Sequence, residues 1–379
     1  MRVGFVLDES LDGTDGVQQY VLRVSEWLRG QGHEVHYLVG ETTRTDVPNI
    51  HSLTRNLHVR FNGNRLSTPL PASWPKLQAV LDELQLDVLH VQAPYSPFMA
   101  GRIMALAAKD TAVVGTFHVL PYSWLASLAS YILGLMNRLS AHRFDTMMAV
   151  STPAQAFAQS HYGLASTVVP NCFDLQTFKT GTANSSQKRI VYLGRLVERK
   201  GPFELVRAVA HLYDQGSWPS DWKVIIGGKG QLKDGIARYI TLHKLEEIIT
   251  LAGFVAEDSK ADFLAQADIA VFPSTAGESF GISLLEAFAS SRGVVLAGDN
   301  PGYRSVMVGF EDQLFSPKDT KVFARLLKQW MHDDKARARL ATAQRSYVKR
   351  FDAHVVGAQI MDVYEKALQS RRQTWHNKS

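Results

Sequence analysis

The strongest constraint on the fold is an alternation of short apolar runs with helical patterns along nearly the whole chain. The apolar runs are rich in β-branched residues and end at glycine, proline or polar residues, as buried strands do. Strands that alternate with helices predict βαβ units and therefore parallel sheets. In the first half we expect strands at 2–7, 34–39, 87–91, 112–117 and 146–150, with the clearest helices at 17–30 and 97–109.

A second series of the same kind follows the polar segment 179–189, which has the composition of a linker. With 379 residues the chain is long for one core, so two series predict two domains, 1–179 and 180–353. The second series has predicted strands at 190–195, 222–227, 249–254, 269–274 and 293–298, helices at 202–214, 259–267 and 281–291, and two terminal helical patterns at 321–349 and 354–370.

Composition excludes several classes of protein. The single cysteine, Cys172, rules out a disulfide framework and a cysteine-rich metal site. No Asp-x-Asp motif and no His/Cys cluster with ligand spacing occurs, so we expect no bound metal. The N-terminus lacks a basic region ahead of a long apolar run, which argues against a secretory signal and favours the cytosol. Basic residues are not interleaved with aromatics on a nucleic-acid-binding motif.

Two stretches without acidic residues, between Asp46 and Asp82 and from Thr111 to Phe144, suggest a surface for an anionic partner such as a phosphate or a lipid, or else chance clustering. The helical segment within the second stretch, YSWLASLASYILGLMNR, is too short to cross about 30 Å of hydrocarbon. Its small and large residues fall on opposite sides. It is either a core helix packed through its serines or an interfacial helix that dips its large side chains into a membrane.

Two places in the first half follow predicted strands, where open α/β sheets bind ligands. Gly13 and Gly16 precede the helix at 17–30, so a phosphate could approach the helix N-terminus, but the neighbouring aspartates make a tight turn without a ligand an equal alternative. His118 ends the strand at 112–117, where it has either a structural role or a role in ligand binding.

The segment GRLVERKG follows the strand at 190–195 and carries Arg195 and Lys200 five residues apart. A guanidinium and an ammonium on one strand-to-helix loop can converge on a diphosphate, with a bidentate contact from the arginine. We therefore favour anion binding over surface charge for this pair.

The segment STAGESFGISLLEA places Glu278 in a loop and Glu286 on the second turn of a helix that we expect to begin near Phe280. The amides of Ser279, Phe280 and Gly281 would then lie at a positive helix end, a natural seat for a diphosphate. At ~1.5 Å per helical residue, the two carboxyl groups lie roughly 10 Å or more apart. Glycosidase acid–base pairs are closer, about 5–9.5 Å. We therefore interpret the two acids as hydrogen-bond acceptors for hydroxyl groups on either side of a phosphate.

In combination, GRLVERKG and, about eighty residues later, ESFGISLLE resemble the retaining glycosyltransferases of family 4. The resemblance extends to GVQQYV, FNGN, GTFHV, VVPNCFD and the C-terminal RFDAHVVGAQIMDVYE, and so covers nearly the whole chain. It implies a GT-B fold, in which two Rossmann-like doubly wound α/β domains face a central cleft and the last helix, 354–379, packs back on the first domain. Within the family, the pattern is most similar to phosphatidyl-myo-inositol mannosyltransferases.

The resemblance also implies roles for individual residues. Arg195 and Lys200 would hold the diphosphate, Glu278 the sugar and Glu286 the ribose, while His118 would contact the sugar from the other domain. Nucleotide-sugar contacts would further involve Gly16, Val255, Lys260, Ser279, Phe280, Gly281 and Ile282, and acceptor contacts Gln18, Asn62, Gly63 and Arg65.

The implied activity is metal-independent transfer of mannose from GDP-mannose to a lipid headgroup, with no cofactor, at the cytoplasmic face of a membrane. UDP-glucose or another nucleotide-sugar is the alternative donor, for glycolipid or polysaccharide synthesis. Two other classes of protein share this architecture. A sugar-nucleotide epimerase would turn over without acceptor, and a non-catalytic membrane-binding protein would bind vesicles without turnover.

Overall fold

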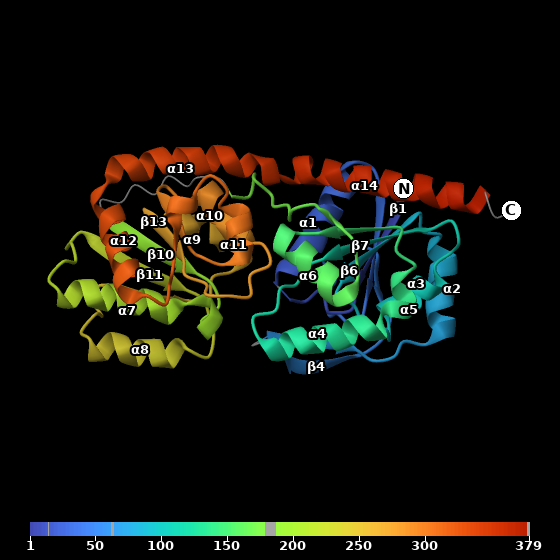
Figure 1. Ribbon diagram of the computed structural model, residues 1–379, viewed down its shortest axis with the longest axis horizontal. Coiled ribbons are helices and arrows are strands. Elements are labelled where there is room, and N and C mark those ends of the chain that lie inside the picture. Colours follow the sequence, from blue (N-terminus) through green and yellow to red (C-terminus); the bar gives the residue numbers. More distant parts are fainter. Residues whose placement is uncertain (14, 62–63, 179–186, 377–379) are drawn as a thin grey trace. The chain divides into compact units, whose positions relative to one another are not determined.

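The computed structural model describes residues 1–13, 15–61, 64–178 and 187–376. It divides into two compact units (Figure 1). The N-terminal unit comprises Met1–Cys172 and the end of the chain from Ala353 onward, and the C-terminal unit comprises Phe173–Asp352. Each unit is built on a parallel sheet with helices, so the prediction of a parallel α/β fold is confirmed.

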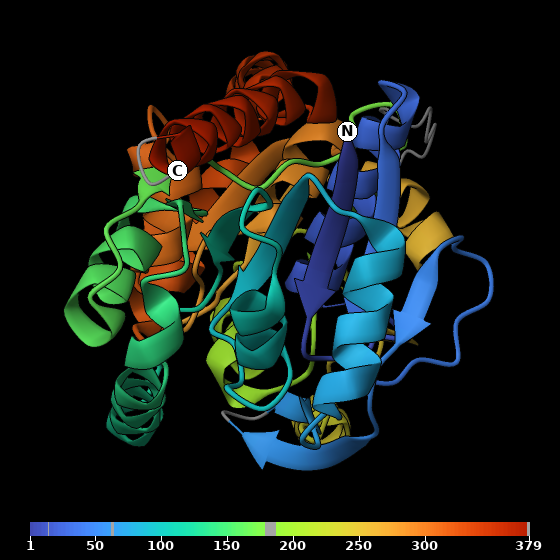
Figure 2. The same ribbon diagram turned by 90° about the vertical axis from the view of Figure 1, so that its right-hand side faces the viewer.

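The sheet of the N-terminal unit has the strand order β3-β2-β1-β6-β7-β8-β9, and all its pairs are parallel. The chain builds outward from β1 in one direction and from β6 in the other, so the switch point lies between these two strands (Figure 2). The strands are β1 (Arg2–Leu7), β2 (Glu34–Val39), β3 (Ile50–Ser52), β6 (Val88–Ala93), β7 (Ala112–Phe117), β8 (Thr146–Ala149) and β9 (Thr167–Val168). A separate antiparallel hairpin joins β4 (Asn56–Phe61) and β5 (Asn64–Pro69).

One core of this unit lies between the sheet and two helices from opposite ends of the sequence, α1 and α14. Alternate residues of β1, such as Val3 and Phe5, point into it, as the pleat of a strand requires. From α14 it receives Ile360 and Tyr364, both fully buried. The helices are α1 (Gly16–Gly30), α2 (Trp74–Leu84), α3 (Ala100–Leu106), α4 (Trp124–Met136), α5 (Arg138–Ala141), α6 (Thr152–Tyr162) and α14 (Ala353–His376).

The C-terminal unit repeats this plan with the order β12-β11-β10-β13-β14-β15, again parallel throughout. Its switch point lies between β10 and β13, so the loops after these two strands are neighbours. The strands are β10 (Lys188–Leu193), β11 (Trp222–Gly227), β12 (Ile249–Gly253), β13 (Ile269–Phe272), β14 (Val294–Gly298) and β15 (Leu314–Phe315).

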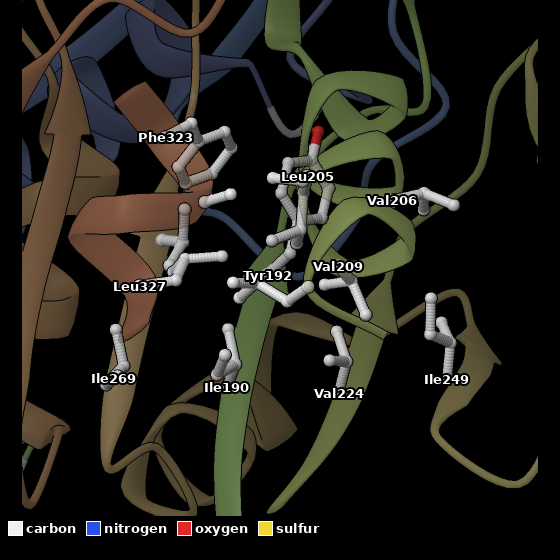
Figure 3. Close-up of a cluster of buried hydrophobic side chains, with 14 of the residues drawn as sticks. Ile190, Tyr192, Leu205, Val206, Val209, Val224, Ile249, Ile269, Phe323 and Leu327 are labelled. Atoms are coloured by element: carbon white, nitrogen blue, oxygen red, sulfur yellow. The ribbon is translucent and has the colours of Figure 1, made fainter. Parts of the chain in front are cut away.

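Strand and helix side chains interdigitate in the core of this unit (Figure 3). Ile190 and Val224 on the sheet lie beside Val209 on α7 and Leu327 on α12. The apolar residues of α7 recur every three or four positions, so one face of the helix is covered by the sheet. The helices are α7 (Pro202–Asp214), α8 (Lys233–Leu242), α9 (Lys260–Ala265), α10 (Ile282–Ser290), α11 (Pro301–Val306), α12 (Thr320–His332) and α13 (Asp334–Val348), and η1 (Glu198–Lys200) is a single 3₁₀ turn.

The expected single helix at 321–349 is wrong, because the chain breaks at Asp333 into α12 and α13. Asp333 leaves helical geometry, with φ −117° and ψ 76°, and its side chain accepts a hydrogen bond from the amide of Ala336 at 2.8 Å. A short acidic side chain can cap the start of a new helix by accepting a hydrogen bond from its backbone, and this competes with continuation of the preceding helix. The capping residue therefore ends α12 and starts α13.

Candidate functional site

The loops after β10 and β13 are joined at the switch point of the C-terminal unit. The carbonyl of Arg199 accepts hydrogen bonds from the amide of Thr275 at 2.8 Å and from the hydroxyl of Ser274 at 2.9 Å. Gly201 makes this approach feasible: it has φ +68°, and a Cβ there would lie 2.0 Å from the carbonyl oxygen of Pro273. The backbone itself therefore fixes η1 against the segment that carries Glu278.

Three side chains contact one carboxylate oxygen in this place. The Nζ of Lys200 lies 2.8 Å from Oε1 of Glu278, and Arg199 donates from Nη1 at 2.9 Å. The hydroxyl of Ser274 lies 2.8 Å from the same oxygen and shares its one proton between Oε1 and the Arg199 carbonyl. We call these four residues the Glu278 cluster. All three contacts end on Oε1, so within the described chain Oε2 is left for a ligand. Two cations beside one carboxylate give the cluster a local positive excess.

The pKa shifts follow from this arrangement. Burial raises the pKa of the Glu278 carboxyl, but the charges of Lys200 and Arg199 outweigh it, so the pKa lies below its ordinary value. Burial lowers the pKa of Lys200, and the carboxylate opposes that shift. Glu278 is therefore ionised near neutral pH and held as a hydrogen-bond acceptor. Because three neighbouring donors stabilise its negative charge, the Glu278 carboxylate is a poor nucleophile.

Helix α10 begins beside the cluster, two residues later than the sequence predicts. Gly281 is its N-cap at φ +128°, with no side chain that caps the helix. The first amides of a helix have no partner inside the helix and suit an anion. Gly302 supports the loop from behind, since a Cβ there would lie 1.9 Å from the carbonyl oxygen of Glu278. The side chain of Phe280 is buried against Phe351, so it holds the loop in place and is not part of the exposed surface.

Glu286 lies on α10 and is only 4% exposed. Its Oε1 lies 3.8 Å from the Nζ of Lys260, which also contacts Glu257 at 2.7 Å. Val255 lies in the loop between β12 and α9, close to the end of β11 at Gly227. The structure therefore brings Glu286, Lys260 and Val255 to the same end of the sheet as the Glu278 cluster.

Arg195 lies two residues after the end of β10, and its carbonyl accepts a hydrogen bond from the hydroxyl of the buried Tyr192 at 2.9 Å. The guanidinium that contacts Glu278 is instead that of Arg199, which the sequence did not single out. Arg199 and Lys200 both lie in η1, and no local pattern in the sequence distinguishes Arg199 from Arg195.

The N-terminal unit has a related arrangement at its own switch point. Asp8 follows β1 and accepts hydrogen bonds from the amide of Ser96, in the loop after β6, and from the amide of Ala100, at the start of α3. Burial raises the pKa of Asp8 to about 7, although these amides oppose the shift. Asp8 is one of the aspartates near Gly13 and Gly16. Its carboxylate fixes one loop to another.

Gly16 is the first residue of α1, and Gln18 lies two positions further into its first turn. Gln18 is buried and donates from Nε2 to Glu9 at 2.9 Å and to the Ser10 carbonyl at 3.2 Å. Its Oε1 is buried without a hydrogen-bond partner among the described residues. An unsatisfied buried oxygen is costly, so Gln18 remains a candidate for ligand contact.

His118 lies immediately after β7 and is 6% exposed. Its Nε2 lies 2.8 Å from the Oε1 of Gln92, and its ring packs edge-on against Tyr20. Burial lowers the pKa of His118 to about 3, so the imidazole is neutral near pH 7 and donates its Nε2 proton to Gln92. It can therefore contact a sugar hydroxyl but cannot neutralise a phosphate.

Of the other predicted acceptor residues, Asn62 and Gly63 lie outside the described residues, and only the backbone of Arg65 is described, in β5. No group of three or more His, Cys, Asp or Glu side chains that could hold a metal ion occurs in the described ranges. Among the helices of the described chain, none combines the length and the apolar character needed to cross a bilayer.

The neutral state of His118 predicts a pH-dependent stability. Below pH 6.5, the pKa of the histidine in the unfolded chain, the unfolded state binds a proton at His118 and the folded state does not. The contribution of His118 to the free energy of unfolding is therefore complete above pH 6.5 and is lost as the pH falls. At pH 5 the loss is about 2 kcal/mol, at 1.36 kcal/mol per pKa unit. His118→Gln removes this titration. Asp8 and His90, which also titrate, are present in both proteins.

We therefore expect the wild-type protein to lose about 2 kcal/mol more free energy of unfolding than His118→Gln between pH 7 and pH 5. Urea unfolding of both proteins at the two pH values measures it. A difference that stays constant over this range would show that His118 is not held neutral.

Two doubly wound parallel α/β units, each with polar side chains at its switch point, define a nucleotide-binding type of architecture. The family description "Glycosyltransferase Family 4" matches residues 14–177, and "Glycosyl transferases group 1" matches residues 175–347. A phosphatidyl-myo-inositol mannosyltransferase of Mycolicibacterium smegmatis is 31% identical over 96% of this chain and 94% of its own length.

Solved structures with the same fold include a glycosyltransferase from Rickettsia africae, with TM-score 0.76 and 16% identity over 97% of this chain and 98% of that one. HepE of Anabaena, crystallised with UDP and glucose, has TM-score 0.70 and 18% identity over 96% of this chain and 99% of that one. The chain belongs to family 4 of the glycosyltransferases and has the GT-B fold. It is a glycosyltransferase, as the sequence motifs predict.

Proposed function

We propose that the chain is a retaining, metal-independent hexosyltransferase that moves mannose from GDP-mannose to a lipid headgroup such as phosphatidylinositol, at the cytoplasmic face of a membrane. The name of the Mycolicibacterium smegmatis relative supports the sugar and the lipid. The observation that carries the proposal is the Glu278 cluster beside the start of α10, because two partly buried cations and a helix start that no side chain caps suit a departing diphosphate.

Each residue has a proposed role on its own unit. In the C-terminal unit, Lys200 and Arg195 bind the diphosphate, and the amides from Ser279 to Ile282 bind its oxygens. Glu278 accepts hydrogen bonds from sugar hydroxyls through Oε2, which suits a carboxylate with its other oxygen occupied. Glu286 binds the ribose, and Val255 and Lys260 the base. In the N-terminal unit we assign His118 and Gly16 to the donor and Gln18, Asn62, Gly63 and Arg65 to the acceptor.

For the transfer step we propose a front-face route. The acceptor oxygen forms the new bond to the anomeric carbon on the side from which the diphosphate leaves, and the acceptor proton passes to the departing phosphate oxygen. Configuration is then retained without a covalent sugar–enzyme intermediate. The occupied carboxylate of Glu278 supports this route, because three donors reduce its nucleophilicity. Lys200 stabilises the charge that develops on the leaving group.

A thermal-shift panel of GDP-mannose, UDP-glucose and ADP-glucose, each with excess EDTA, tests the donor. At 100 times its dissociation constant, GDP-mannose should add about 2.7 kcal/mol of stability. Glu286→Ala should reduce the shift, whereas Glu246→Ala, at an exposed position of the same unit, should not. A shift with UDP-glucose alone would identify UDP-glucose, and not GDP-mannose, as the donor. A shift that is absent in EDTA and appears only when a divalent metal is supplied would contradict metal independence.

Transfer itself is followed with GDP-mannose and phosphatidylinositol vesicles. We expect a mannosylated lipid whose new linkage has the α configuration of the donor by NMR. An inverted product would rule out the front-face route, and conversion of the donor without acceptor would indicate an epimerase.

A further inference from the structure

Helix α4 presents an unusual surface for a helix at the edge of an α/β unit. Seven large apolar side chains are exposed along it: Trp124 at 73%, Leu125 at 60%, and Leu128, Tyr131, Ile132, Leu135 and Met136 at 41–50%. At about 100° per residue these positions occupy one continuous arc of the helix. We call them the α4 apolar face. Contiguous exposed apolar surface of this kind marks an interaction site.

The opposite side of α4 is fixed to its own unit. Ala126, Ser130 and Gly134 are buried, and α4 packs on α6, which lies directly above it in Figure 1. A Cβ on Gly134 would lie 2.3 Å from the carbonyl oxygen of His161, and the hydroxyl of Ser127 lies 2.8 Å from the Nε2 of the same histidine. The helix therefore cannot rotate its large side chains inward without losing this close contact.

Charge and residue type on α4 favour a lipid surface as its occupant. The segment from Thr111 to Asn137 has no charged residue, and the first charged one after it, Arg138, is exposed. Nothing on the helix therefore repels anionic headgroups, and a cation stands at its end. Trp124 and Tyr131 are of the types that concentrate at membrane–water interfaces. With 13 residues, α4 is about 20 Å long and so lies along a bilayer rather than across it.

We propose that the α4 apolar face docks the protein on a lipid bilayer, with the helix axis parallel to the surface and the large side chains at the boundary of headgroups and acyl chains. The choice of lipid over protein rests on the proposed function, since a lipid acceptor would lie in the same bilayer. Apolar burial drives the docking, so it persists on uncharged lipid and at high salt.

Co-sedimentation with vesicles of phosphatidylcholine, alone or with phosphatidylinositol, tests the surface without donor or transfer. We expect the wild-type protein to pellet with both. The double variant Trp124→Gln/Leu128→Gln should lose at least about tenfold in partitioning, because polar groups replace two of the seven apolar side chains, including Trp124, the most exposed of them. Leu242→Gln is the matched control, since Leu242 is 77% exposed on α8 and lies outside α4.

A second variant guards against misfolding. Trp124→Phe keeps an apolar side chain and should still pellet, while the blue shift of tryptophan emission that vesicles cause in the wild-type protein should be lost. Pelleting of the double variant like wild type, or no binding of wild type to either vesicle, overturns the proposal. So does a wild-type dimer that becomes monomeric in the double variant without any lipid binding, because the face would then join two copies.

The outcomes separate this inference from the proposed activity. If docking is right, the double variant keeps the full thermal shift with GDP-mannose but no longer co-sediments with vesicles. If the donor assignment is wrong but docking is right, the nucleotide panel fails and vesicle binding still depends on Trp124 and Leu128.

Discussion

Replacing Lys200 by methionine is expected to lower glycosyl transfer by about 100- to 1,000-fold, the usual cost of removing one group that stabilises transition-state charge. Methionine keeps most of the volume and removes the ammonium. Arg199 and Ser274 still hold Glu278, so the carboxylate is not left without partners. The loss should therefore appear mainly in kcat, with a small change in the free energy of unfolding.

Lys188→Met is the matched control for this variant. Lys188 lies at the other end of β10 and contacts Asp221 at 3.5 Å and Asp334 at 3.3 Å. It is a lysine in ion pairs on the same strand but far along it from the Glu278 cluster, and transfer by this variant should stay near the wild-type rate. A Lys200→Met enzyme within about threefold of wild type would remove Lys200 from the proposed mechanism, since a threefold change is well under 1 kcal/mol.

Gly201→Ala is expected to have the largest effect on stability of any single methyl addition considered. Its φ of +68° costs about 1–2 kcal/mol for a residue with a Cβ. The new methyl group would also lie 2.0 Å from the carbonyl oxygen of Pro273, which neither backbone can relieve without moving. Overpacking of this kind adds about 1–3 kcal/mol.

Gly216→Ala separates the two contributions. Gly216 has nearly the same conformation, φ +61°, but no atom lies within 4 Å of its added Cβ. It should lose about 1–2 kcal/mol through backbone strain alone. Urea unfolding of the two variants gives the difference. Transfer should fall only in Gly201→Ala, because η1 would be displaced from Thr275 and Glu278. Equal destabilisation by both variants would show that the loops at Gly201 and Pro273 are not tightly joined.

Local sequence patterns predicted the parallel α/β architecture because a buried strand and an amphipathic helix each carry a signal within a few residues. They also predicted that GRLVERKG and ESFGISLLE follow strands, and the parallel register of β10 and β13 makes those two loops neighbours. The identities of Lys200 and Glu278 could therefore be inferred together. The break at Asp333 could not, since one polar residue in a helical pattern reads equally as surface or as cap.

Two features were decided only by tertiary structure. The partner of Glu278 beside Lys200 is Arg199, because the 3₁₀ turn and the carbonyl contacts of Arg199 orient the loop, and none of these is encoded by spacing alone. The sequence of α4 defines a small side and a large side but not which side is covered. The packing of Gly134 on His161 settles it, since only side chains without bulk allow two backbones to come so close.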